Sequence, residues 1–415
     1  MVGGGAREHA ILWKLAKSPR VERLYAAPGN AGTALLASNL DIKPTDIRAL
    51  IKATRENEID LVVVGPEAPL AAGITDRFQE NGIPIFGPTQ SAATIESSKV
   101  FARHLMQKYQ IPCAHGTSFS NYNRAKKHLL EQKLPVVIKA DGLAAGKGVT
   151  VASSLSEADE ALYQTMVDKI HGPAGDRVII EECLTGKEMS AFAFTDGNTV
   201  VPIVPACDYK PVYDGNSGPN TGGMGSYSPP HFTSGELEQK ITKAILEPAV
   251  DALARENRLY QGVLYAGLMI TSEGPKVMEF NARFGDPETQ AILPRLKTDL
   301  LNIFLATSRG NLDEIDVKWS GDSCVAVVMS SGGYPGSYHT GYPISGLENL
   351  ESDVMVFHAG TRTGTKKGEI LSDGGRVITV VGTGSNIARA RERVYHNISH
   401  IHFEGCHYRK DIAMV

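Results

Sequence analysis

The chain of 415 residues has few cysteines and no long apolar run, and these absences exclude several classes of protein. Its five cysteines lie far apart and form no Cys-x-x-Cys pair, which is typical of reduced thiols in a cytoplasmic protein rather than of a disulfide framework. No apolar stretch is long enough to span a bilayer, and the sequence shows no charged-then-apolar leader. The formal net charge is -4 and no long basic run occurs, so neither a nucleic acid nor a membrane is a predicted partner.

Strand and helix signals divide the chain into three regions, and the predicted fold class is α/β and α+β with several domains. In residues 1–98, short apolar strands alternate with amphipathic helices, which predicts a doubly wound parallel sheet. Thr45 is the predicted cap of one of these helices. Residues 99–310 carry hairpin signals, including a turn at 196–197. Residues 311–415 have the pattern of a smaller α+β region with many glycine turns.

The opening "MVGGGAREHA" is typical of a strand that turns into a helix start, where main-chain N–H groups favour anions. A dinucleotide fingerprint requires G-x-G-x-x-G and an acid about twenty residues later. Glu8 stands where the last glycine would be, and the second predicted strand ends in Ala26-Ala27-Pro28. The sequence therefore disfavours an NAD-dependent dehydrogenase.

The stretch "KADGLAAGKGV" places two lysines in and beside a glycine-rich loop. Glycines let the main chain approach a phosphate and turn its N–H groups toward it, and the lysines add positive charge. The spacing is not that of a P-loop, which needs four residues between its glycines and Ser or Thr after the lysine. The alternative is a plain glycine hairpin with solvated lysines. The residues concerned are Lys139, Gly142, Gly146, Lys147 and Gly148.

The stretch "KVMEFNARFGDPETQ" predicts a strand with a carboxylate and an amide on one face. Glu279 and Asn281 alternate with Met278 and Phe280, which are expected to face a core. Carboxylate and amide oxygens suit Mg²⁺, which takes few protein ligands when phosphates supply others. The alternative is an edge strand with a solvated polar face. Polar groups crowd the segment that follows, at Arg283, Asp286 and Glu288.

Three weaker features complete the candidate set. The strand end "VIIEECLTGKE" offers main-chain groups and carboxylates for an adenine and a ribose, although such acids are usually just solvated. The glycine-rich "GPNTGGMG" is either a functional loop or a disordered lid. A cluster of histidines and a cysteine in "HNISHIHFEGCHYRK" has soft ligands for zinc but no standard zinc spacing.

Taken together and in this order, these motifs resemble those of the ATP-grasp enzymes. The strings "GGGAREHA", "APGNAGT", "VGPEAPL", "GPNTGGMGSYSP", "FNARFGDPETQ", "GGYPG" and "CHYRKDI" resemble the phosphoribosylamine–glycine ligase family along essentially the whole chain. The resemblance implies a Rossmann-like substrate domain in residues 1–98, an ATP-grasp domain in 99–310 with a mobile lobe at about 113–190, and a C-terminal domain in 311–415. It also implies a cytoplasmic monomer or weak dimer.

The resemblance further implies a reaction and its site. ATP, glycine and 5-phosphoribosylamine give glycinamide ribonucleotide, ADP and phosphate in purine biosynthesis, with Mg²⁺ or Mn²⁺ as the metal. The implied catalytic residues are Arg283, Lys147 and Asp208, and the implied metal ligands are Glu279 and Asn281. ATP is assigned to Lys99, Lys139, Gly142, Gly146, Lys147, Gly148, Glu181, Glu182, Leu184 and Glu188. The other substrates are assigned to Gly5, Glu67, Asp208, Lys210, Asn220, Thr221, Arg283 and Asp286.

Three departures from the family pattern carry expectations of their own. The strand "YAGLMI" lacks the further metal-binding acid of many ATP-grasp enzymes. Pro211 and Asn216 stand where Arg and Asp are usual, so this loop is expected to be less ordered or differently charged. Only Met1 and Val2 precede the first glycines, where the family has about five more apolar residues, so the first strand is expected to be short and the protein less stable.

Other functions remain as alternatives at this point. Within the superfamily, a carboxylase or another amine ligase would share the ATP site and differ at the acceptor site. A non-enzymatic nucleotide sensor would not need Arg283, Asp286 and Glu288 crowded beside the metal pair.

Overall fold

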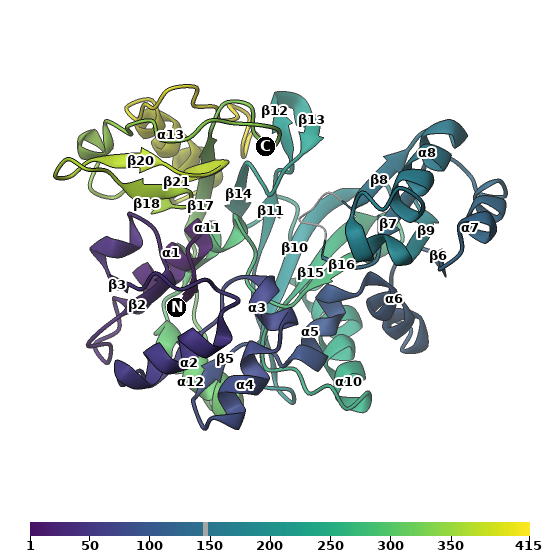
Figure 1. Cartoon of the computed structure of the whole chain (residues 1–415), viewed down its shortest axis with the longest axis horizontal. Coiled ribbons are helices and arrows are strands. Elements are labelled where there is room, and N and C mark those ends of the chain that lie inside the picture. The colour runs from purple at the N-terminus through teal and green to yellow at the C-terminus, as the bar shows by residue number, and fades with distance from the viewer. Residues whose placement is uncertain (144–147) are drawn as a thin grey trace.

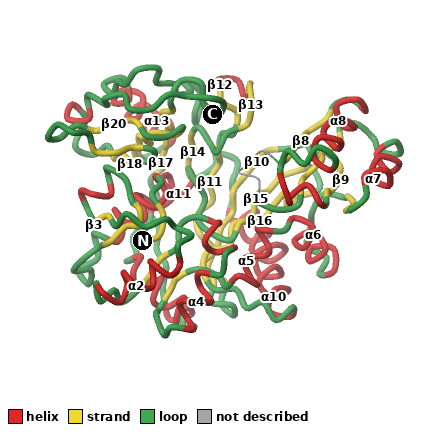
Figure 2. Tube along the Cα trace, viewed as in Figure 1, coloured by secondary structure: helices red, strands yellow, loops and turns green. Residues whose placement is uncertain are grey.

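The structure, a computed structural model, describes residues 1–143 and 148–415 of the chain (Figure 1). It has a body built around one eight-stranded sheet and a smaller lobe that projects to one side, as Figure 2 also shows. Within the two described ranges, no helix has both the length and the apolar composition needed to cross a membrane.

The N-terminal segment is a parallel α/β unit, as the sequence predicts. Its strands are β1 (Val2–Gly3), β2 (Tyr25–Pro28), β3 (Ser38–Asn39), β4 (Val62–Val63) and β5 (Ile85–Phe86), and its helices are α1 (Ala6–Leu15), α2 (Ile47–Glu56), α3 (Glu67–Ala71), α4 (Ile74–Glu80) and α5 (Gln90–Ser97). All strand pairs are parallel, and a bridge from Val2 to Val64 joins β1–β2–β3 to β4–β5. The predicted cap of α2 is wrong: Asp46, not Thr45, accepts the N–H of Ala49, at 3.1 Å.

The lobe is a four-stranded antiparallel sheet with its own apolar core. It contains β6 (Gly116–Phe119), β7 (Val136–Ala140), β8 (Val149–Ala152), β9 (Val178–Glu182), α7 (Tyr122–Leu129) and α8 (Leu155–Met166), and α6 (Lys99–Lys108) precedes it. Helices α7 and α8 pack on the sheet, and Leu129, Leu162 and Ile180 are among the buried side chains between them. Strands β7 and β8 pair around the glycine-rich loop, which confirms the predicted pair of strands.

The body is organised by a sheet with the strand order β16-β15-β10-β11-β14-β17-β21-β18. The strands are β10 (Lys187–Thr195), β11 (Val200–Asp208), β14 (Gly225–Ser228), β15 (Gly262–Thr271), β16 (Gly274–Asn281), β17 (Ser323–Ser330), β18 (Met355–His358) and β21 (Arg376–Gly384). In the hairpin of β10 and β11, Thr195 pairs with Val200, so the loop spans 196–199 and includes the predicted turn at 196–197. The last three strands in this order come from residues 311–415, so the C-terminal region extends the same sheet.

Smaller elements cover and connect the sheet. They are α9 (Gly235–Ile241), α10 (Glu247–Arg255), α11 (Glu288–Ile292), α12 (Leu300–Arg309), β19 (Thr361–Thr363), β20 (Ile370–Ser372) and α13 (Ile387–Ile398). Between β11 and β14, the chain forms a projecting segment, here called the arm (residues 209–224), with a hairpin of β12 (Pro211–Tyr213) and β13 (Ser217–Asn220). Helix α13 packs on β17 and β21.

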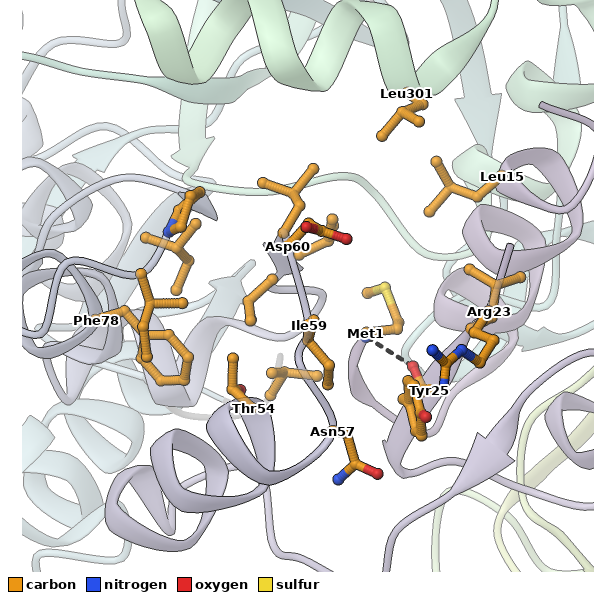
Figure 3. A pocket seen from close by; sticks show the side chains of 18 of the residues that line it. Met1, Leu15, Arg23, Tyr25, Thr54, Asn57, Ile59, Asp60, Phe78 and Leu301 are labelled. Atoms are coloured by element: carbon orange, nitrogen blue, oxygen red, sulfur yellow. Dashed lines mark hydrogen bonds between the residues drawn. The ribbon is translucent and has the colours of Figure 1, made fainter. Parts of the chain in front are cut away.

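A cavity of about 870 Å³ lies in the N-terminal segment beside the two-residue strand β1 (Figure 3). Residues 21–27 and 57–63 border it from two sides, and apolar side chains such as Leu15, Phe78 and Leu301 line it. The amino group of Met1 enters from one end and donates a hydrogen bond to the carbonyl of Tyr25 at 2.8 Å. Burial lowers the pKa of this amino group to about 5. The first strand is thus as short as the sequence predicts.

Candidate functional site

A second cavity, of about 660 Å³, lies where the lobe, the eight-stranded sheet and the N-terminal segment meet. Most of the residues selected from the sequence line this one cavity, although they come from segments far apart in the chain. They are Glu67, Lys99, Lys139, Gly142, Gly148, Glu181, Glu182, Leu184, Glu188, Asp208, Lys210, Asn220, Thr221, Glu279, Asn281, Arg283 and Asp286. Gly146 and Lys147 fall outside the described residues. Gly5 lies beside the cavity, where a Cβ added to it would be 3.7 Å from Asp286 Oδ2.

Lysines from two elements approach the cavity on the side of the β7–β8 hairpin. Lys99, the first residue of α6, donates to the carbonyl of Gly142 at 3.1 Å. Lys139, buried on β7, donates to the carbonyl of Met278 at 2.9 Å and forms an ion pair with Glu181. These contacts hold two cations beside the glycine-rich loop, where a phosphate chain would find both positive charge and main-chain N–H groups.

Glu181 and Glu182 are more tightly bound than the sequence indicates. Arg103, which the sequence analysis missed, pairs with Glu181 at 2.8 Å, so this buried carboxylate lies between two cations. Glu182 accepts the main-chain N–H of His115 at 2.8 Å. Glu181 therefore holds Lys139, Glu182 holds the strand end, and residues 182–184 line the cavity beside them.

Glu279 and Asn281 lie on β16 at the centre of the cavity wall. The register of β15 and β16 shifts between Gly267 and Leu268, and this irregularity turns Met278 into the cavity lining. The prediction that Met278 faces a core is therefore wrong, whereas Phe280 is buried as expected.

The carboxylate of Glu279 is held in its charged form. Burial alone would raise its pKa, but the attraction of Lys210, Lys139, Lys99 and Arg283 outweighs burial and lowers the pKa. Within the described ranges, no group of three His, Cys, Asp or Glu side chains is arranged to hold a metal ion. The pair of Glu279 and Asn281 fits Mg²⁺ better than zinc, because both offer hard oxygen donors and Mg²⁺ completes its shell with water and phosphate oxygens.

Arg283 is anchored by two carboxylates from the N-terminal segment. Its guanidinium lies 2.9 Å from Glu96 and 3.2 Å from Glu67, and it donates to the carbonyl of Phe284 at 3.2 Å. Burial opposes the charge, but the two carboxylates raise the pKa of Arg283 above its ordinary value. Glu96 also accepts the N–H of Ala282 at 2.7 Å. The sequence analysis missed Glu96, because its place near the end of α5 carries no pattern that marks it as an arginine partner.

Asp208 and Lys210 flank the end of β11. Lys210 pairs with Glu188 at 2.9 Å and lies 3.8 Å from Asp208. Burial raises the pKa of Asp208 to about 7, with the nearby carboxylates of Glu288 and Glu188 acting in the same direction and Lys210 opposing them. About half of the Asp208 carboxyl groups are therefore ionised at neutral pH. Such a raised pKa is unusual for an aspartate and frequent in functional sites.

The first glycine turn differs from the expected anion site. The carboxylate of Glu8 accepts the N–H of Gly5 at 2.6 Å. Glu8, the residue that breaks the dinucleotide fingerprint, therefore also takes up the main-chain N–H group that was expected to bind an anion. Arg7, on the first turn of α1, lines the cavity and donates to the carbonyl of Phe284 at 3.2 Å. The cation of Arg7, rather than the amide of Gly5, is what this turn presents to the cavity.

The arm is more strongly held than the sequence indicates. Arg409, which is fully buried, donates to the carbonyl of Pro211 at 3.0 Å and to Asn216 Oδ1 at 2.9 Å. His407 Nε2 lies 2.8 Å from the carbonyl of Val212. The two unusual residues therefore do not loosen this hairpin, because the C-terminal end of the chain binds them. His407 thus contacts the arm, and no group of side chains suited to zinc occurs in the described residues.

Comparisons with known proteins agree with this arrangement. The family of phosphoribosylglycinamide synthetases matches in three parts: its N domain over residues 1–96, its ATP-grasp (A) domain over 97–289 and its C domain over 324–415. A phosphoribosylamine–glycine ligase of Caldanaerobacter subterraneus subsp. tengcongensis is 52% identical, and the match covers 100% of this chain and 98% of the relative.

Two solved structures add the three-dimensional comparison. The phosphoribosylamine–glycine ligase of Thermotoga maritima superposes with a TM-score of 0.86 at 33% identity, covering 99% of this chain and 98% of the other. A biotin carboxylase of Campylobacter jejuni has a TM-score of 0.76 at 14% identity, covering 100% and 93%, and shows the shared fold alone. The chain belongs to the phosphoribosylglycinamide synthetase family and has its three-part ATP-grasp architecture.

Proposed function

We propose that the protein ligates glycine to 5-phosphoribosylamine at the expense of ATP, giving glycinamide ribonucleotide, ADP and phosphate in purine biosynthesis. One observation carries this proposal: a single cavity places Lys99, Lys139 and Lys210 around the half-buried Glu279, and Arg283 Nη2 donates to Asn281 Oδ1 at 3.4 Å. Membership of the family supplies the identity of the substrates.

The nucleotide end of the cavity is assigned to the lobe. The main chain of 182–184 and Glu188 receive adenine and ribose, and Lys99, Lys139 and the 142–148 loop receive the phosphates. Glu279 and Asn281 would hold Mg²⁺ or Mn²⁺. A bound cation there neutralises the phosphate charges and orients the transferred group.

The other two substrates are assigned to the opposite end. Asp208, with its carboxylate near the point of ionisation, receives the ammonium group of glycine, and Arg283 receives its carboxylate. Glu67, Asn220, Thr221 and Asp286 line the region left for phosphoribosylamine, with Gly5 beside it.

The chemistry requires positioning and charge compensation more than a protein nucleophile. A carboxylate oxygen of glycine takes the γ-phosphoryl group, which forms glycyl phosphate and releases ADP. The amine then attacks the carbonyl carbon, the bond to the phosphate oxygen breaks, phosphate leaves and the amine loses a proton. Lysines and Arg283 compensate the negative charge as the phosphoryl group passes between two anions. The lobe and the arm exclude water from the reactive acyl phosphate.

A coupled assay of ADP release tests the proposal with the whole protein. ADP release should require glycine and phosphoribosylamine together with ATP and Mg²⁺. ADP release with bicarbonate in place of glycine would overturn the proposal in favour of a carboxylase. Release with glycine and a different amine, but not with phosphoribosylamine, would identify another amine ligase.

A further inference from the structure

The C-terminal region reaches the cavity through one residue that the sequence analysis did not select. Arg376 is the first residue of β21, and its guanidinium lines the cavity. Its neighbours in space come from two separate segments, the loop after β16 and the end of the arm. A single C-terminal side chain thus joins two parts of the cavity wall.

The geometry at Arg376 matches the planar fork of a guanidinium. Nη2 donates to Asp286 Oδ2 at 2.9 Å, while Nη1 donates both to the carbonyl of Asp286 at 3.0 Å and to the carbonyl of Gly222 at 2.6 Å. A lysine ammonium is a point charge without this fork, and it does not reproduce the three contacts from one place. The arrangement therefore depends on arginine and not merely on positive charge.

The contact is electrostatically strong on both sides. Burial alone would disfavour both charges, but Arg376 lowers the pKa of Asp286, and Asp286 raises the pKa of Arg376. Arg7 and Gln290 also lower the pKa of Asp286. Asp286 is therefore an anion in a fixed orientation, although it is mostly buried.

The side chains around Arg376 are closely packed, which leaves no space for larger residues at the neighbouring glycines. Tyr334 accepts the N–H of Gly222 at 3.0 Å, and a Cβ added at Gly222 would lie 3.2 Å from Arg376 Cζ. A Cβ added at Gly375 would lie 2.3 Å from the ring of Tyr334, so glycine at 375 lets Tyr334 pack beside the start of β21. These glycines make a docking point for the end of the arm.

We propose that Arg376 is a positioning residue for the phosphoribosylamine end of the cavity. It fixes the carboxylate of Asp286 beside Gly5, and it fixes Gly222 directly after Thr221, so it sets the spacing between the two walls that receive this substrate. The inference rests on the proposed function, because the assignment of this end to phosphoribosylamine comes from there. Arg376 acts through Asp286 and the arm, and the ATP end of the cavity does not depend on it.

The test measures KM and kcat for each substrate in Arg376→Gln and Arg376→Lys. Both variants should raise the KM for phosphoribosylamine at least tenfold, because the two walls lose their common tie, whereas the KM for ATP should change less than twofold. Arg362→Gln is the matched control, since this arginine of β19 is half-exposed and pairs only loosely with Asp373, at 3.5 Å. It should leave all three KM values unchanged.

A double-mutant cycle separates positioning from general stability. If Arg376 acts through Asp286, the effect of Arg376→Gln on the KM for phosphoribosylamine should be much smaller in an Asp286→Asn background. Fully additive effects, an equal rise in the KM for ATP or rescue by lysine would each overturn the positioning role. If the unmodified protein shows no ligation with phosphoribosylamine, the proposed function fails instead, so the two failures are distinguishable.

Discussion

The two cavities have similar volumes, about 870 Å³ and about 660 Å³, but their linings differ in composition. Apolar side chains and main chain, together with charged side chains such as Arg23, Glu58 and Asp60, border the larger cavity, which lies beside the two-residue strand β1. Charged side chains from the N-terminal segment, the lobe, the sheet and the C-terminal region converge on the smaller one. Volume therefore does not identify the functional site, but convergence of buried charges from distant segments does.

The two cavities also affect the stability of the folded protein in different ways. Unfilled apolar walls forfeit packing and leave apolar surface exposed to water. The charged cavity partly buries Glu279, Asp286 and Arg283, and each has an opposite charge within reach that offsets the cost of burial. Removing a charge from the smaller cavity and adding apolar groups to the larger one should therefore act on different properties, namely catalysis and stability.

The largest expected effect is that of Arg283→Ala. Ligation should fall by about two orders of magnitude or more, because the side chain that receives the carboxylate of glycine is lost and a well-aimed hydrogen-bond donor is worth about 3 kcal/mol in the transition state. ADP binding, measured by calorimetry, should remain within about threefold, because the lysines of the nucleotide end are untouched.

The control must account for the partners of Arg283. Glu96 and Glu67 lose their counter-charge in Arg283→Ala, and breaking a buried pair costs about 3–5 kcal/mol of stability. Arg283→Lys keeps a cation there and should restore folding but little activity, because a lysine lacks the planar fork. Near-normal turnover in Arg283→Ala would show that the glycine end has been assigned wrongly.

A smaller effect is expected from the titration of Asp208, whose pKa is about 7. The protonated acid has no charge with which to attract an ammonium group, so the affinity for glycine should fall about tenfold per pH unit as the pH decreases below 7. Calorimetry of glycine binding in the presence of ADP measures this directly. Asp208→Asn should bind glycine weakly with a flat pH profile, and an unchanged slope in this variant would assign the titration to another group.

Local patterns in the sequence predict the fold class and the hairpins, and the resemblance to a known family adds most of the residues that line the cavity. Glycine-rich turns, strand alternation and the string "FNARFGDPETQ" are readable within a few residues. The partners of these residues are not local: Glu96, Arg103 and Arg376 reach Arg283, Glu181 and Asp286 across the fold. The error at Met278 has the same origin, since a register shift depends on how the neighbouring strand pairs.

The smallest effect should come from the apolar cavity, and it should appear in stability first. An extension of about five β-branched residues before Met1 can continue β1 between the stretches 21–27 and 57–63, where it would cover the apolar walls. Burial of such side chains should raise the melting temperature on the order of 5 °C. It should also lower the KM for phosphoribosylamine modestly, because β1 leads directly into the Gly3–Gly5 turn. A Gly-Ser extension of equal length is the matched control, and at pH 8 and above it should raise neither stability nor affinity.

The amino group of Met1 provides the internal check on this result. Its pKa is about 5 in the folded protein and about 8 when unfolded, so the unfolded chain binds more protons between these values and stability rises with pH from 5 to 8. Either extension moves the charge out of its buried place and should flatten this dependence. At pH 8 and above, where burial of the charge no longer matters, only the apolar extension should still raise the melting temperature. Equal melting temperatures for the two extensions at that pH would show that the unfilled apolar walls do not lower the stability of the fold. The two cavities would then differ only in the chemistry of their linings.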